Sequence, residues 1–123
     1  MDRAAGPILI VEDDTLLALD LSDILESAGY EVLAPAFTNV SACQTLKTIR
    51  PAFAILDYNL GVATSVETAR ELIALKVPFI YLTGNATALI EDVSAPHADI
   101  LSKPFAPDDV LRAVEHPAKS RNS

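Results

Sequence analysis

The sequence predicts a doubly wound α/β fold, in which a parallel sheet carries helices on both faces. Short apolar runs alternate with segments whose apolar residues recur at helical spacing, as in βα units around a parallel sheet. The apolar runs are continuous, which indicates strands that are covered on both faces. The length of 123 residues suits one domain, so we expect a single domain over residues 1–123, with frayed tails at 1–7 and 118–123.

Five strands are predicted from apolar runs that turn or helix signals separate. β-Branched and aromatic residues are common in these runs, which favours strands over short buried helices. The predicted strands cover residues 8–11, 30–36, 53–56, 79–82 and 100–101.

The clearest helix signal follows the first strand. Apolar residues fall at i, i+4, i+7, i+8 and i+11 between Leu17 and Ala28, which places them on one face of a helix. Asp14 is expected to cap the start of this helix, and Gly29 stands where a left-handed cap belongs.

Caps and prolines bound the four remaining helices. Asn39 is predicted to cap a helix over residues 40–49, and Thr64 with Glu67 forms a capping-box pattern that opens the third helix. The third helix stops before residue 78, and the short fourth helix, within 85–98, ends at the proline at 96. Pro107 opens the last helix, which runs to about residue 116.

The composition excludes several classes of function. A net charge of −8 without any Lys/Arg cluster argues against direct nucleic-acid binding. No apolar run approaches the roughly 20 residues of a membrane helix, and the N-terminus lacks the basic-then-apolar order of a secretory signal. The single cysteine, Cys43, falls in an apolar helical pattern, so we expect it in the core of a cytoplasmic protein.

Polar residues that are capable of chemistry follow the predicted strands. Glu12 and Asp13 come after the first strand, Asp57 after the third, Thr83 after the fourth and Lys103 after the fifth. Ligands of open parallel sheets bind outside the carboxyl ends of the strands. The sequence therefore predicts that these five residues form one site.

Carboxylates at neighbouring strand ends repel one another unless a cation lies between them. Because no cysteine or histidine lies near these strand ends, the oxygen ligands favour Mg²⁺ over zinc. Lys103 adds a second positive charge. A carboxylate nucleophile, a metal, a hydroxyl and an ammonium are the groups that phosphoryl transfer requires.

Four motifs follow one another along the whole chain. They are Ile8-Leu9-Ile10-Val11-Glu12-Asp13-Asp14, Ile55-Leu56-Asp57, Tyr81-Leu82-Thr83-Gly84 and Lys103-Pro104-Phe105. Their acidic, hydroxyl and lysine positions are separated by 44, 26 and 20 residues. Each motif alone is weak, but their order and spacing together resemble the response-regulator receiver domain of two-component signalling. This resemblance implies a flavodoxin-like sheet of five parallel strands in the order 2-1-3-4-5.

The resemblance also implies roles for the acidic residues. Asp57 would accept a phosphoryl group from the phosphohistidine of a histidine kinase or phosphotransfer protein. Asp57 and Asp13 would bind Mg²⁺ together with the backbone carbonyl of Asn59, and Glu12 would act largely through a metal-bound water.

Thr83 would hydrogen-bond the phosphoryl group, Lys103 would pair with it, and the Lys103–Pro104 peptide would be cis. Phosphorylation would switch the binding of an unidentified downstream protein, and a homodimer formed on phosphorylation is left open. Such a domain catalyses only its own phosphorylation and dephosphorylation, so we expect no enzyme acting on another substrate.

Two features depart from the usual receiver pattern. Ile100 stands where receivers usually carry Tyr or Phe, so we expect coupling through backbone shifts or through Tyr81. The short segments before and after the fourth strand predict trimmed third and fourth helices. The fourth strand resembles that of single-domain receivers that read Phe-Ala-Thr-Gly-Tyr, with Asn85 in place of the last aromatic residue, and we expect no output domain.

Two other functions stay open. A Mg²⁺-dependent phosphatase of the haloacid-dehalogenase kind would need a second acid two residues after its nucleophile, where this chain has Asn59. An interaction module that works without phosphorylation is favoured by Ile100 but opposed by the intact set of site residues. Tyr58 is expected to shape access to the pocket, and no role is predicted for His97 or His116.

Overall fold

The computed structural model describes residues 6–116, which form a parallel sheet with helices on both faces. Its four strands lie in the order β1-β2-β3-β4. The strands are β1 (Ile8–Val11), β2 (Phe53–Asp57), β3 (Phe79–Thr83) and β4 (Asp99–Ser102). The helices are α1 (Thr15–Ser27), α2 (Asn39–Thr48), α3 (Val66–Ala74), α4 (Ala86–Glu91) and α5 (Pro107–Glu115).

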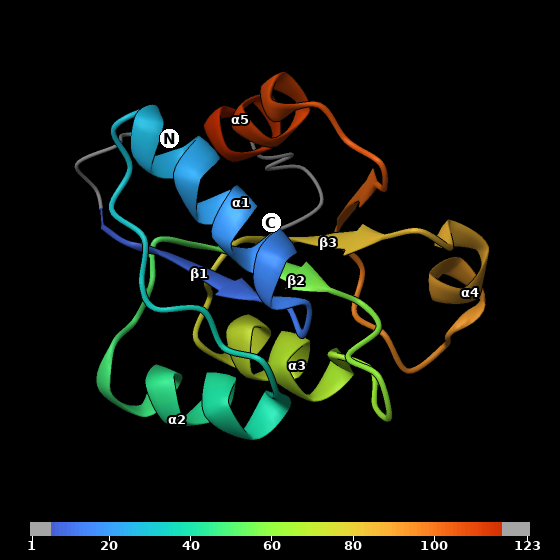
Figure 1. Ribbon diagram of the computed structural model, residues 1–123. Coiled ribbons are helices and arrows are strands. Elements are labelled where there is room, and N and C mark those ends of the chain that lie inside the picture. Colours follow the sequence, from blue (N-terminus) through green and yellow to red (C-terminus); the bar gives the residue numbers. More distant parts are fainter. Residues whose placement is uncertain (1–5, 117–123) are drawn as a thin grey trace.

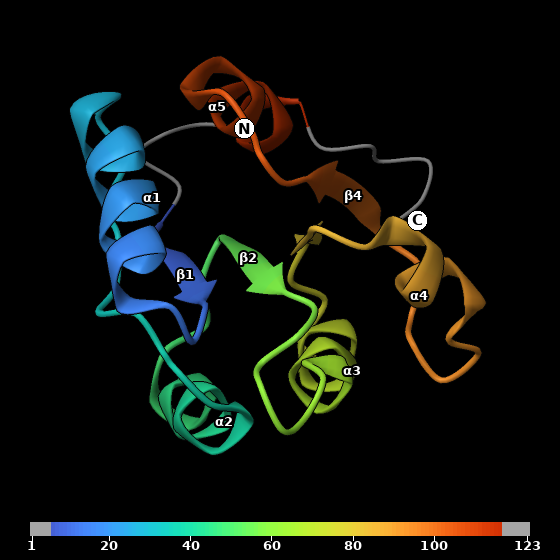
Figure 2. The same ribbon diagram turned by 45° about the vertical axis from the view of Figure 1, so that its right-hand side comes forward.

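The helices divide between the two faces of the sheet, as Figure 1 shows. Helices α1 and α5 lie over one face and α2 and α3 over the other, while α4 lies at the β3–β4 edge (Figures 1 and 2). Every residue of the first three strands is buried, as the continuous apolar runs predicted. Two apolar clusters result, one on each face: the first includes Leu9, Leu56 and Leu72, and the second Ile10, Leu21 and Val110.

The predicted count of five strands is wrong for the described residues, because the segment over 30–36 makes only isolated bridges to β1. Val32 bridges Ile8 and Ala36 bridges Val11, so the segment has one more residue than the strand it accompanies. A regular ladder would need an N–H from Pro35 to reach the Ile10 carbonyl, and proline has none. The Ala36 N–H makes that bond instead, at 2.9 Å. The segment still lies beside β1, where the predicted strand order places it.

The first helix begins and ends as predicted, while the next two begin at different residues. The Asp14 side chain accepts hydrogen bonds from the backbone at the start of α1, and Gly29 follows the helix with φ of 96°. Thr38, rather than Asn39, caps α2, and its side chain accepts from the Ser41 N–H. Helix α3 follows Ser65 without any side-chain cap, so the capping box predicted at Thr64 is wrong.

The Asn39 side chain has a different task from the predicted cap. Its Nδ2 donates to the Thr64 carbonyl at 2.8 Å, and its Oδ1 accepts from the Thr68 hydroxyl at 2.6 Å, so it ties α2 to α3. Cys43 lies in the same helix and is half-buried rather than part of the core. Helices α3 and α4 have 9 and 6 residues, and the Asn85 side chain caps α4. Over residues 6–116, the structure has no helix with the length and apolar content needed to span a membrane.

We predict that Leu72→Ala lowers the free energy of unfolding by about 2–5 kcal/mol, because Leu72 packs α3 onto the sheet with no exposed surface. Its neighbour Ile73 is 50% exposed and supplies a matched control, so Ile73→Ala should cost under about 1 kcal/mol. Urea unfolding would measure both variants. Equal losses would contradict the observed packing of α3.

Candidate functional site

The carboxyl ends of the strands bring the predicted site residues to one edge of the sheet. Asp57 ends β2 and pairs in register with Leu82, while Thr83 ends β3 and pairs with Ser102. These ends open into a groove of about 430 Å³. Its lining residues are Asp13, Asp57, Asn59, Gly61, Thr83, Gly84, Asn85 and Lys103.

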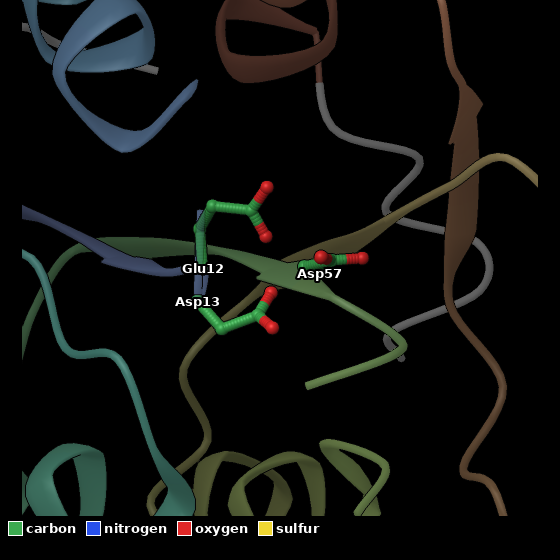
Figure 3. Close-up of side chains that lie close together, drawn as sticks. All are labelled: Glu12, Asp13 and Asp57. Carbon is green, nitrogen blue, oxygen red and sulfur yellow. The ribbon is translucent and has the colours of Figure 1, made fainter. Parts of the chain in front are cut away.

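Three carboxylates converge beside this groove. One oxygen from each of Glu12, Asp13 and Asp57 lies within 4.8 Å of the other two, and Figure 3 shows the three side chains lying close together. Glu12 is fully buried and Asp57 is 5% exposed, whereas Asp13 faces solvent. The structure thus brings together the three acidic side chains that the sequence predicts, two of them directly after β1 and one at the end of β2.

Lys103 lies across two of these carboxylates. Its Nζ is 3.2 Å from Asp57 Oδ2 and 3.3 Å from Glu12 Oε1. The Lys103 backbone N–H donates to the Thr83 carbonyl at 2.8 Å, so the lysine is also held to the end of β3. The Lys103–Pro104 peptide is cis, as expected.

Burial and neighbouring charges shift the pKa values of Glu12 and Lys103. Burial raises the pKa of Glu12 from 4.5 to about 8, and the nearby Asp57 carboxylate adds to the shift. Burial works to lower the pKa of Lys103, but the attraction of Asp57 and Glu12 outweighs it and the pKa is raised. The lysine therefore keeps its positive charge, while Glu12 favours its neutral form.

The residues present fit a divalent cation. When all three carboxylates are ionised, one ammonium cannot neutralise them, and Glu12 Oε2 is buried with no hydrogen-bond partner. A hard cation with oxygen ligands would resolve both conditions. Asn59 also lines the groove. On either side of it, the Ser65 N–H donates to the Tyr58 carbonyl and the Leu60 N–H donates to the Ala63 carbonyl. These two bonds do not involve the Asn59 carbonyl, which is therefore available as a ligand.

Thr83 is 3% exposed, and its hydroxyl oxygen accepts a hydrogen bond from the Asn85 N–H at 3.0 Å. The hydroxyl oxygen is thereby engaged as an acceptor at the groove that Asp57 also lines. The Asn85 side chain caps α4 by accepting from the Ala88 N–H. The start of α4 is thus joined directly to the Thr83 hydroxyl.

The sequence reasoning missed Gly61 as a residue of the groove. Its φ is 85°, and a Cβ built on it would lie 3.5 Å from Asp13 Oδ2. The Gly61 N–H donates to the Asn59 side-chain oxygen at 3.1 Å, which closes a turn at the groove. The Asn-x-Gly pattern at 59–61 is a turn signal that could have identified this residue.

The expected role of Tyr58 at the pocket entrance is wrong. Tyr58 is buried in the apolar cluster on the α2–α3 face, does not line the groove, and donates its hydroxyl to Asp92. Ile100, from β4, also lies outside the groove. His97 and His116 belong to neither the groove nor the acidic cluster.

Comparison with known proteins gives a family match over most of the chain. The family model described as the response regulator receiver domain matches residues 8–115. The chemotaxis protein CheY of Thermotoga maritima is 27% identical over 116 residues, which cover 91% of this chain and 97% of that protein. The phyllosphere-induced regulator PhyR of Methylorubrum extorquens is 29% identical over 113 residues, which cover 89% of this chain but only 42% of PhyR.

Solved structures with the same fold agree with this match. The receiver domain of the sensor histidine kinase PA1611 from Pseudomonas aeruginosa superposes with a TM-score of 0.79 at 28% identity, covering 91% of this chain and 96% of that one. That structure has a magnesium ion coordinated in its active-site cleft. A CheY-like receiver domain from Methanospirillum hungatei gives a TM-score of 0.75 at 26% identity, with 89% and 90% of the two chains covered.

We predict that the metal-free protein loses stability as pH rises from about 4.5 to about 8, because folded Glu12 keeps a proton that the unfolded chain releases in this window. Glu12→Gln, which stays neutral, should flatten that part of the pH profile. Glu31→Gln, at an exposed glutamate outside the site, is the matched control. Urea unfolding in EDTA from pH 5 to pH 8 (chosen to span the window) would measure the slopes, and equal slopes in wild type and Glu12→Gln would contradict the prediction.

Proposed function

This chain belongs to the response-regulator receiver domain family, and from that premise we propose that it accepts a phosphoryl group on Asp57 with the help of Mg²⁺. The proposal is carried by one observation: a nearly buried carboxylate at the end of β2 lies between two further carboxylates and a lysine ammonium. Electrostatic stabilisation by groups already in place is the main requirement of phosphoryl transfer.

Asp57 is the carboxylate best placed to act as the nucleophile. Its Oδ2 is paired with Lys103, and its Oδ1 accepts a bond from the Asn59 N–H at 3.3 Å, so both oxygens are oriented. Unlike Glu12, which is fully buried, Asp57 lines the open groove. A carboxylate oxygen of Asp57 would form the new P–O bond while the P–N bond of a phosphohistidine breaks, and the released imidazole nitrogen takes up a proton.

Asp13, Asp57 and the Asn59 carbonyl would hold Mg²⁺, with Glu12 acting largely through a bound water. The bound ion would neutralise the negative charge of the phosphoryl oxygens. The buried and unpartnered Glu12 Oε2 supports this set of ligands, because an acceptor in that position is costly without a cation or a proton.

Thr83 and Lys103 would recognise the phosphoryl group once it is on Asp57. The Thr83 hydroxyl oxygen already accepts from the backbone, so its remaining hydrogen is available to donate. The Lys103 ammonium is held at the groove by two carboxylates, and it would stay paired with Asp57 by bonding the new phosphoryl oxygens.

The partners follow from the family. Receiver domains act between histidine kinases and downstream targets, so we propose a kinase or a histidine phosphotransfer protein as the donor and a protein as the target. The chain spans nearly all of CheY from Thermotoga maritima but about half of the transcriptional regulatory protein PdtaR of Mycobacterium tuberculosis, at 54% of its length. The proposed target is therefore a protein that binds this domain, and it is not inferred from the activities of the longer relatives.

We propose no turnover of an external substrate. A phosphatase that uses an aspartyl-phosphate would need an acid at position 59, and the Asn59 amide oxygen is engaged by the Gly61 N–H. Release of phosphate from an added phosphate ester, at a rate above the slow loss of the protein's own phosphoryl group, would favour the phosphatase instead.

We predict that acetyl phosphate with Mg²⁺ adds one phosphoryl group to the wild-type protein and none to Asp57→Asn, because an amide lacks the nucleophilic oxygen. Asp14→Asn is the matched control, since it removes a neighbouring carboxylate while asparagine still caps α1. Intact-protein mass spectrometry would measure the gain, and EDTA should abolish it.

An unmodified wild type, or an undiminished gain in Asp57→Asn, would overturn this proposal. A target that binds the phosphorylated and unphosphorylated forms equally would favour an interaction module that works without phosphorylation.

A further inference from the structure

The loop between α4 and β4, residues 92–98, is held against the sheet by two tyrosine hydroxyls. Tyr58 donates its hydroxyl to Asp92 Oδ2, and Tyr81 donates its hydroxyl to the Pro96 carbonyl at 2.9 Å. A third bond, from Arg70 Nη2 to the Ser94 carbonyl at 3.2 Å, lies at the surface of α3. The two tyrosine bonds are part-buried, so they hold the inner side of this loop against the protein.

Both tyrosines lie within two residues of the proposed phosphoryl-binding residues. Tyr58 directly follows Asp57, and Tyr81 lies two residues before Thr83. Their rings meet edge to face, with centroids 6.2 Å apart, and both side chains are almost completely buried. A shift of either strand end therefore moves a hydroxyl that bonds the loop.

The donor and acceptor have suitable charge states at neutral pH. A phenolic hydroxyl carries its proton at neutral pH, so Tyr58 acts as the donor of this bond. Hydrogen bonds from Ser94 and Tyr58 lower the pKa of Asp92, so its carboxylate is ionised. A bond to an ionised acceptor is stronger than one between neutral groups.

Ile100 offers no such bond, because its side chain has no polar atom. It lines a cavity of about 360 Å³ that Tyr81, Asp92 and Pro96 also line. The Tyr58 and Tyr81 hydroxyls, by contrast, bond this loop from the ends of β2 and β3.

We propose that the α4–β4 loop is a latch that the Tyr58 and Tyr81 hydroxyls close in the unphosphorylated protein and that phosphorylation of Asp57 releases. This inference rests on the proposed function of Asp57. A phosphoryl group must fit beside Asp57 and draw the Thr83 hydroxyl toward it, which displaces the ends of β2 and β3. Hydrogen bonds weaken steeply with misalignment, so small displacements suffice to release the loop next to the exposed Ile90 and Val93 side chains.

The first test measures the latch without phosphorylation, by hydrogen exchange at the Ser94 and Ala95 amides. Both amides bond to Asp92, at 2.9 and 3.1 Å, so their exchange reports opening of the loop. We expect exchange to quicken on the order of tenfold in Tyr58→Phe and about fivefold in Tyr81→Phe, as the net strengths of such bonds imply. Tyr30→Phe, a buried tyrosine in the cluster on the α1–α5 face, is the matched control and should change nothing at these amides.

Unchanged exchange in both phenylalanine variants would overturn the latch, whatever the pocket does. Both variants keep the packed ring, so loss of the fold does not confuse the result.

The second test adds beryllofluoride and Mg²⁺, which mimic the phosphoryl group on Asp57. We expect the amide signals of Thr83 and Lys103 to shift in the wild type and in both variants, while exchange at Ser94 and Ala95 quickens mainly in the wild type. Pocket shifts without quickened exchange in the wild type would overturn the latch and leave the proposed function standing. An absence of pocket shifts in the wild type would overturn the proposed function, and the released latch with it.

Discussion

The parallel pairing of four strands brings three carboxylates and one ammonium close together at one edge of the sheet, and the properties of the site depend on that concentration of charge. Glu12 and Asp57 lie at adjacent strand ends because β1 and β2 pair in register from Ile8 with Phe53 to Val11 with Leu56. Burial then raises the pKa of Glu12, and the carboxylates together hold Lys103 in its charged form. A site with this excess of negative charge favours the binding of a cation.

Such a site is costly to fold, and the two apolar layers offset that cost. Strands buried on both faces, with α1 and α5 on one side and α2 and α3 on the other, supply the apolar area that compensates for unpaired charge at one edge (Figure 1). The unfavourable burial of charge is confined to the strand ends, and even there Asp13 remains exposed to solvent in the groove.

The ends of β2 and β3 each supply one residue to the groove and one tyrosine to the contacts with the α4–β4 loop. At the end of β2, Asp57 lines the groove, while Tyr58, the residue after the strand, lies in the apolar cluster on the α2–α3 face. In β3, Tyr81 and Thr83 are two residues apart, so they lie on the same face of the sheet. The residues of the groove and the residues that bond the α4–β4 loop are thus only one or two positions apart along the chain. No aromatic residue at position 100 is needed for such a connection.

The sequence alone determined the βα order, the first helix with its Asp14 cap and the residues at each strand end, because these depend on local periodicity and on which residue follows an apolar run. It did not determine the edge segment over 30–36, where Pro35 interrupts a ladder that exists only once β1 lies alongside. The caps of α2 and α3 were decided by a contact between helices, since Asn39 bonds residues 25 and 29 positions away. The role of Tyr58 was likewise decided by tertiary structure, because its partner Asp92 lies 34 residues along the chain and no local pattern joins them.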